Sequence, residues 1–126
     1  MHAYENNAFF WQKLDTLYLS SKLVIDRPKN TSHYKYSNLI YPVDYGYLSD
    51  VDEAPIDVFK GSQKSSKVGA IVVSADILKK DCKAKLLIGC NEEEIHDILI
   101  FLNQTDYQKA VLLRRGNEIP EWANID

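Results

Sequence analysis

Apolar side chains recur at helical spacing in two segments of the chain, residues 5–19 and residues 91–103. Either Asn6 or Asn7 can cap the first of these segments. In the second, Asn91 and Glu94 have the spacing of a capping box. The sequence therefore predicts two helices. Their apolar faces comprise Phe10, Leu14, Leu17 and Tyr18 in the first helix, and Ile95, Ile98, Leu99 and Leu102 in the second.

Short segments rich in β-branched residues predict strands between and after these helices. They lie at residues 22–26, 56–60, 68–74, 84–90 and 109–115, with a weaker alternation over residues 34–41. Proline and glycine predict a bend over 42–47, and polar residues predict loops over 49–55 and 61–67. Many short strands between two helices favour an α+β fold built around a small barrel.

The length of 126 residues and the apolar fraction of 45% fit one domain with one buried core. We expect this single domain to span residues 1–126. Its parts would be the helix at 5–19, the barrel at about 22–90, the helix at 91–103, and a final strand and tail at 109–126.

Charge and cysteine usage exclude several classes of protein. The net charge is −3 and the basic residues are scattered, which argues against nucleic-acid binding. Apolar runs are only a few residues long and the first ten residues lack signal-peptide features, so we expect no membrane segment. Cys82 and Cys90 are eight residues apart, which favours reduced thiols in a cytoplasmic protein.

Carboxylates stand in loops and at the ends of several predicted strands. If folding gathered them, they would repel one another unless a cation neutralised them, and carboxylate oxygens favour Mg²⁺ or Mn²⁺. Such ions suit phosphoryl chemistry, with lysine and tyrosine side chains binding phosphate oxygens. The candidates are Asp26, Asp52, Asp57, Asp76, Asp81, Lys35, Lys83, Tyr41 and Tyr45. On spacing alone, solvated turn residues remain the alternative for the aspartates.

Four motifs occur in order along the chain. Residues 52–57 (DEAPID) resemble D-G-D-P-x-D, and residues 41–47 (YPVDYGY) resemble Y-P-x-N-Y-G-[FY]. Upstream, residues 25–28 (IDRP) followed by Lys35-Tyr36 resemble [IV]-E-I-P followed by K-Y, and residues 76–83 resemble D-x-x-x-x-D-x-K. With these motifs the chain resembles the family I (soluble) inorganic pyrophosphatases over about residues 22–90.

The resemblance implies a five-stranded, OB-like β-barrel with flanking helices, assembly into a homo-oligomer, and Mg²⁺-dependent hydrolysis of pyrophosphate or a related small phosphate compound. It implies metal positions at Asp52, Asp57, Asp81 and Asp76, with Asp26 close by. It implies phosphate contacts from Lys35, Tyr45 and Lys83, supported by Tyr41. Asp57, Tyr45 and Lys35 would then form the catalytic set.

The chain departs from the family pattern at several positions. Ala54 stands where the resemblance implies the aspartate that acts as general base, and a methyl group cannot accept a proton. Only five residues separate Lys35 from Tyr41, which leaves no room for the hairpin that carries a phosphate-binding arginine in the family. Two functions therefore stay open: a hydrolase of reduced activity, in which Glu53 or Asp44 positions the attacking water, or an inactive relative that binds metal, phosphate or a partner.

Overall fold

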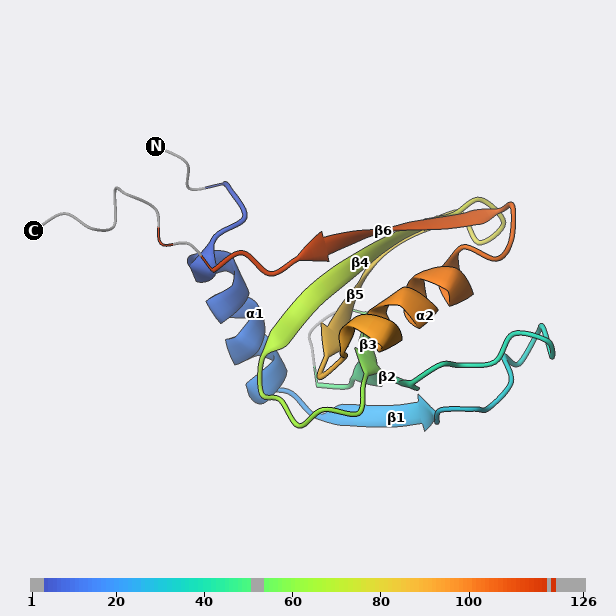
Figure 1. Ribbon diagram of the computed structural model, residues 1–126, viewed down its shortest axis with the longest axis horizontal. Coiled ribbons are helices and arrows are strands. Elements are labelled where there is room, and N and C mark those ends of the chain that lie inside the picture. Colours follow the sequence, from blue (N-terminus) through green and yellow to red (C-terminus); the bar gives the residue numbers. More distant parts are fainter. Residues whose placement is uncertain (1–3, 51–53, 118, 120–126) are drawn as a thin grey trace, which may run out of the picture.

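The chain folds into a six-stranded sheet with two helices, an α+β arrangement (Figure 1). The computed structural model describes residues 4–50, 54–117 and 119. The elements follow one another as α1 (Ala8–Leu19), β1 (Leu23–Arg27), β2 (Asp44–Leu48), β3 (Ile56–Lys60), β4 (Val68–Asp76), β5 (Asp81–Ile88), α2 (Glu92–Leu102) and β6 (Gln108–Arg114).

The strands lie in the order β1-β2-β3-β5-β4-β6. Only the β3–β5 pair is parallel. After β3 the chain skips one position in the sheet to form β4, and then returns as β5 in the position between them, antiparallel to β4. The sheet has one strand more than the expected five, since β6 pairs with the free side of β4. Among the described residues no pairing joins β1 to β6, so the sheet is open and these two strands are its edges.

Both predicted helices are present, together with their caps. The side chain of Asn7 accepts a hydrogen bond from the Phe9 N–H at the start of α1. At the start of α2, Asn91 and Glu94 form the capping box, each side chain accepting from the backbone N–H of the other. These caps satisfy backbone donors that the first helical turn leaves unpaired.

The region from residue 34 to residue 48 differs from the sequence prediction. The expected strand at 34–41 is a loop with one isolated bridge between Ser32 and Ile40. The expected bend at 42–47 instead overlaps β2, which begins at Asp44. Gly46 explains the error, because a side-chain carbon at this position would overlap the Val24 carbonyl on the neighbouring strand. The glycine therefore permits close strand pairing instead of marking a turn.

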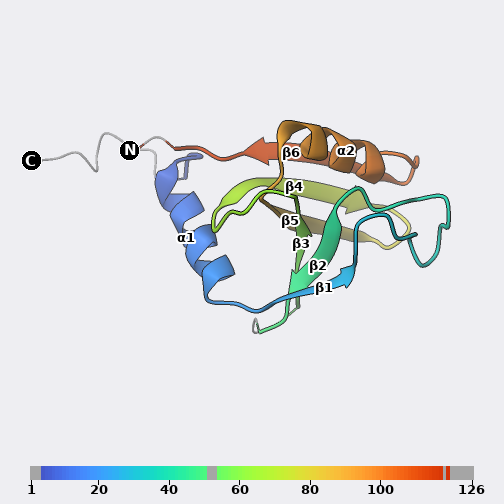
Figure 2. The ribbon, with the colours of Figure 1, turned by 60° about the horizontal axis from the view of Figure 1, so that its bottom comes forward.

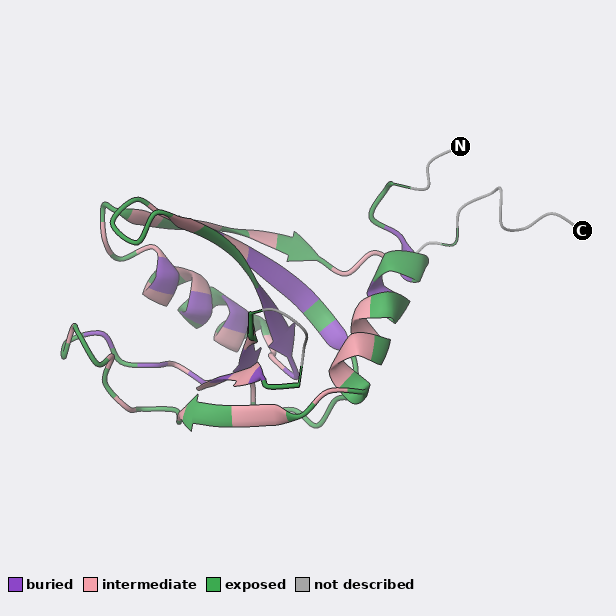
Figure 3. Cartoon of the chain, turned by 180° about the vertical axis from the view of Figure 1, so that it is seen from behind, coloured by how far each residue is buried: buried purple, intermediate pink, exposed green. Residues whose placement is uncertain are grey.

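The two helices cover opposite faces of the sheet (Figure 2). One apolar cluster lies beneath α2 and the other beneath α1. Figure 3 shows the buried residues concentrated in the central strands and on the inner side of α2, while β1 has none. The α2 cluster comprises Val43, Phe59, Ala70, Val72, Leu87, Ile95, Ile98 and Leu102; the α1 cluster comprises Trp11, Leu48, Val58, Val68, Ile71, Leu86 and Ile88.

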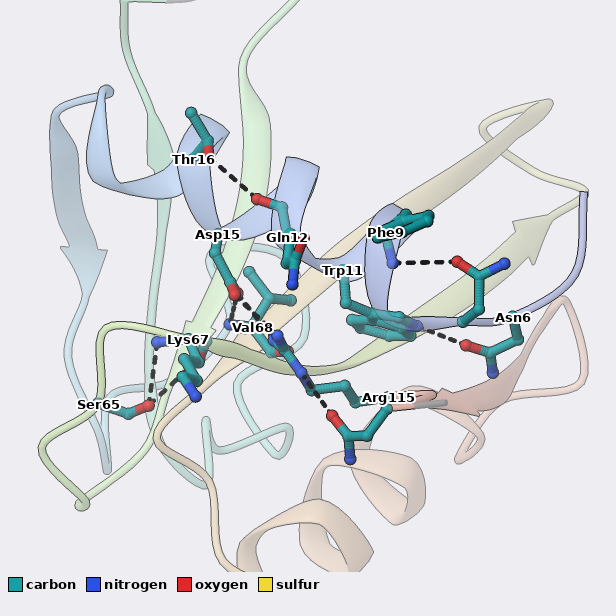
Figure 4. Close-up of polar contacts among 12 residues, drawn as sticks. Asn6, Phe9, Trp11, Gln12, Asp15, Thr16, Ser65, Lys67, Val68 and Arg115 are labelled. Atoms are coloured by element: carbon teal, nitrogen blue, oxygen red, sulfur yellow. Dashed lines mark hydrogen bonds and ion pairs between the residues drawn. The ribbon is translucent and has the colours of Figure 1, made fainter. Parts of the chain in front are cut away.

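An ion pair joins α1 to the segment that follows β6 (Figure 4). Both terminal nitrogens of Arg115 donate to the Asp15 carboxylate at 2.8 Å, and each side chain is 15% exposed. The same carboxylate accepts the Val68 backbone N–H at 2.8 Å. The Arg115 guanidinium therefore holds the pKa of Asp15 below its ordinary value, and the pair fixes α1 against the sheet.

Replacing Asp15 with Asn should lower the free energy of unfolding by about 2 kcal/mol near neutral pH, because charge-assisted hydrogen bonds are lost. Since the folded-state pKa of Asp15 lies below its unfolded value of 3.8, this stabilisation is complete above that pH and declines as the pH falls through the folded-state pKa. Urea denaturation of both proteins across pH 2 to 7 measures this. The two curves should converge in acid, and a gap that persists at low pH would contradict the account. Asp97→Asn, an exposed change on α2, is the control.

Candidate functional site

A pocket of about 250 Å³ is lined by residues of the 28–41 loop, the β4–β5 turn and the C-terminal end of α2, together with residues of β1, β2, β3 and β5. Its polar and charged lining comes from strands distant in sequence. The lining residues used below are Asp26 and Arg27 of β1, His33, Lys35 and Tyr41 of the loop, Tyr45 of β2, Asp76 and Lys79 at the β4–β5 turn, Lys85 of β5 and Phe101 of α2.

Lys85 is the most deeply placed charge in this pocket. Its side chain is 10% exposed, and its Nζ donates hydrogen bonds to Asp57 Oδ2 at 2.9 Å and to Tyr45 Oη at 3.0 Å. The side chain of Asp57 is 19% exposed. A charge so far removed from water needs such partners, because burying it alone is strongly unfavourable.

Strand register brings these three side chains together. Asp57 of β3 lies beside Lys85 in the parallel β3–β5 pair, and Tyr45 of β2 lies opposite Phe59 of β3. Side chains two residues apart on a strand share a face, so Asp57, Phe59 and Tyr45 all lie on the α2 side of the sheet. The arrangement is therefore a consequence of strand pairing rather than of a loop.

A β-bulge between Ile25 and Arg27 shapes the β1 side of the pocket. In a regular strand, neighbouring residues face opposite sides of the sheet. Here Asp26 and Arg27 both line the pocket, because the bulge breaks the alternation.

The pocket carries an excess of positive charge. Among the described residues that line it, four cationic side chains (Arg27, Lys35, Lys79 and Lys85) face two carboxylates (Asp26 and Asp76). The pKa of His33 is lowered below 6.5, mainly by burial. The nearby positive charges of Lys79, Arg27 and Lys35 lower it further. Its Nδ1 also accepts backbone N–H groups from residues 35 and 36. An anion in the pocket would therefore be stabilised by several cations at once.

Aromatic rings form the wall of the pocket. The ring of Tyr41 lies 5.3 Å from Tyr45 and 4.8 Å from Phe101, centroid to centroid, and 6.1 Å from His33. Burial raises the pKa of Tyr41, and burial together with the charge of Asp57 and a hydrogen bond to it raises the pKa of Tyr45 strongly. Both phenols therefore keep their protons at neutral pH and can act as hydrogen-bond donors.

The structure brings most, but not all, of the sequence candidates to this pocket. Asp26, Lys35, Tyr41, Tyr45 and Asp76 line it. Asp57 lies behind Lys85, to which it is bonded. Asp81 lies opposite Asp76 in the β4–β5 pair, and Lys83 is exposed on β5 and does not line the pocket. Asp52, like Glu53, is outside the described residues.

Only some of the side chains expected to bind Mg²⁺ are placed where they could do so. Within residues 4–50, 54–117 and 119, no three His, Cys, Asp or Glu side chains gather as a metal-binding group. Asp57 holds an ammonium instead of being free for a metal ion. Asp76 and Asp81 lie opposite each other in the β4–β5 pairing. Asp76 Oδ1 accepts the backbone N–H groups of Leu78 and Lys79, and Asp81 does not line the pocket. Mg²⁺ at phosphate sites commonly needs only one or two carboxylates besides the phosphate oxygens, so these two positions supply the number of carboxylates that such an ion needs.

Lys85 is the main residue that sequence reasoning missed, with Arg27, His33 and Lys79 also unassigned. A signal for Lys85 was present in the sequence: it follows Asp81 and Lys83 at two-residue spacing in the segment DCKAKLLI, so it shares their face. Its partner could not be identified without knowing which strand lies beside β5.

The chain was compared with known proteins, and neither a protein-family model nor a curated protein sequence matches it. Within the described residues no helix is long and apolar enough to span a membrane.

We expect His33 to titrate below pH 6.5 and its pKa to rise when Lys79 is replaced by Met, because one of the repelling charges is removed. The lowered pKa also means that this histidine contributes less to stability as the pH falls below 6.5, since the unfolded state then binds the proton more readily. NMR titration of the His33 imidazole signals in wild type and in the variant measures both values. An unchanged His33 pKa in the variant would show that the Lys79 charge does not reach the pocket.

Proposed function

We propose that the chain binds pyrophosphate, or a related small phosphate compound, in this pocket and hydrolyses it to phosphate with the help of Mg²⁺. One observation carries the proposal: residues as far apart in the sequence as Asp26 and Gln108 line one pocket with an excess of positive charge. The motif resemblance to soluble inorganic pyrophosphatases draws on several of the same residues. We also propose that the six-stranded sheet of this chain corresponds to the OB-like barrel of the soluble inorganic pyrophosphatases.

The character of the pocket supports a compact, highly charged anion. A volume of about 250 Å³ lies below the several hundred Å³ typical of pockets for larger ligands. Ammonium and guanidinium groups donate charge-assisted hydrogen bonds to phosphate oxygens, which are the strongest in this class. The neutral phenol of Tyr41 adds a donor without adding charge.

Each group has a definite task in the proposed reaction. Lys35, Arg27 and Lys79 hold and orient the phosphates near the pocket opening, and Lys85 holds them from below. When Mg²⁺ is bound it polarises phosphate oxygens and makes water a better nucleophile. Asp76 and Asp81 are the described carboxylates proposed to hold this ion together with the phosphate oxygens, and Asp52 is proposed to join them.

Binding without hydrolysis is the second candidate function, and Ala54 favours it. Its methyl group stands where the resemblance implies the general base, on an exposed segment before β3. Losing a positioned base reduces a rate by roughly 10²- to 10⁴-fold. The chain would then be a sensor or carrier of a phosphate compound, with the same pocket and the same ligand class.

The wild-type protein should release phosphate from pyrophosphate in the presence of Mg²⁺. The double variant Asp76→Asn/Asp81→Asn should lose roughly 10²-fold or more of this rate, because an ion at the reacting phosphates stabilises developing charge by several kcal/mol. Asp97→Asn is the matched control and should retain the wild-type rate. If purified wild-type protein releases phosphate no faster than buffer, hydrolysis is excluded and only the binding function remains.

Ala54→Asp should raise the rate of pyrophosphate hydrolysis, because it supplies a carboxylate where the resemblance implies the base. Since the residue is exposed, the substitution should leave the unfolding free energy within about 0.5 kcal/mol of wild type. Ala54→Asn introduces a polar side chain of nearly the same shape as aspartate, but an amide is a poor base. This variant therefore separates the effect of a general base from the effect of adding a polar side chain. Equal rates in the Asp and Asn variants would contradict the proposed role of this position.

A further inference from the structure

We propose that Lys85 is itself a phosphate-binding residue, so that the pocket binds pyrophosphate without a divalent cation, and that Asp57 acts as the positioning residue of Lys85. The inference rests on the proposed ligand class, a small phosphate anion, but does not require hydrolysis. It assigns to one lysine of β5 a role that neither the sequence motifs nor the expected metal positions contain.

The donor inventory of Lys85 supports this role. A protonated lysine has three N–H donors in a roughly tetrahedral arrangement. Two of them bond to Asp57 Oδ2 and Tyr45 Oη, at 2.9 and 3.0 Å. Because Lys85 also lines the pocket, its third N–H remains for a ligand there. A phosphate oxygen is the acceptor that best matches a charged donor.

The partners of Lys85 hold this ammonium in place. Asp57 supplies the counter-charge, and Tyr45 also hydrogen-bonds to Asp57, so the three side chains restrain one another. A lysine stem on the surface loses rotational freedom when it binds an anion. Lys85 has already lost that freedom on folding, so binding a phosphate orders little more of the side chain.

A purely structural role explains the arrangement less well. An ion pair inside a protein adds little stability compared with apolar side chains of similar size, because both charges must leave water. The neighbouring positions on this face, Phe59 and Leu87, are apolar and fully packed. A charged pair that adjoins an electropositive pocket is more useful as a binding group than as core packing.

The pair also changes the role expected for Asp57. A metal ion bound to Asp57 Oδ2 would compete with the ammonium that already lies 2.9 Å from this oxygen. Two cations at one carboxylate oxygen repel each other strongly where water is largely excluded. The geometry therefore favours a built-in lysine cation at Asp57, and leaves Asp76 and Asp81 as the described positions for Mg²⁺.

Isothermal titration calorimetry with pyrophosphate in EDTA tests the inference directly on the full-length chain. Wild-type protein should bind, and Lys85→Met should bind roughly tenfold more weakly or worse, since a charge-assisted hydrogen bond is removed. Lys13→Met makes the same chemical change on an exposed position of α1, on the opposite face of the sheet, and should match wild type. Lys85→Arg keeps the charge and should retain part of the affinity.

Two further variants guard against a folding defect, because Lys85→Met leaves Asp57 without its partner. In the double variant Lys85→Met/Asp57→Asn both charges are removed, and it should fold yet bind pyrophosphate in EDTA as weakly as Lys85→Met does. Asp57→Asn alone keeps the lysine but loosens its position, so this variant should bind metal-free pyrophosphate more weakly than wild type and more tightly than Lys85→Met.

The inference is overturned if wild type does not bind pyrophosphate in EDTA, or if the folded double variant binds it as tightly as wild type. A separate phosphate-release assay with Mg²⁺ keeps the two proposals apart. Lys85-dependent binding without phosphate release would sustain this inference and reject hydrolysis. Phosphate release that does not change in Lys85→Met, together with unchanged binding, would sustain hydrolysis and reject this inference.

Discussion

The ion pair between Lys85 and Asp57 is the contact around which the pocket is arranged. Carboxylates and phenols from several strands gather on the α2 side of the sheet, and such a gathering needs a cation. The parallel pairing of β3 with β5 supplies it from the chain itself, since register alone puts the two residues side by side. Tyr45 completes the group from β2. A slip of one residue in the β3–β5 pairing would turn Asp57 away from Lys85 and dissolve the arrangement.

The sequence predicted correctly those helices and strands that are determined by residues close together in the chain. The α2 capping box, the Asn7 cap and the exact bounds of β3 follow from residues within a few positions of one another. The prediction for residues 34–48 was wrong because Gly46 is required by the close approach of the neighbouring strand β1, and not by a turn in its own segment. The described strands form an open sheet rather than a closed barrel. The order of six strands depends on pairings between distant segments, and periodicity within one strand carries no information about its neighbours.

The same distinction applies to the candidate site. Motif spacing led to Asp26, Lys35, Tyr41, Tyr45 and Asp76, all of which line the pocket. It assigned Asp57 to a metal, whereas the structure pairs that carboxylate with Lys85. Lys83, two residues earlier on the same face, was the lysine expected at the site, yet it is exposed and outside the pocket lining. Lys83 and Lys85 lie on the same face of β5, so the sequence pattern does not distinguish them. Which of the two is buried in the pocket depends on how far along β5 the covering by α2 and the 28–41 loop extends.

A crystal structure of the protein with imidodiphosphate, a pyrophosphate analogue that resists hydrolysis, and Mn²⁺ would test the central claim most directly, because the ion can be located by its anomalous scattering. We expect a phosphate oxygen at about 2.8 Å from Lys85 Nζ, the Lys85–Asp57 pair intact, and any Mn²⁺ on the Asp76 and Asp81 side of the pocket. Mn²⁺ bound to Asp57, with the Lys85 ammonium displaced from it, would contradict the account.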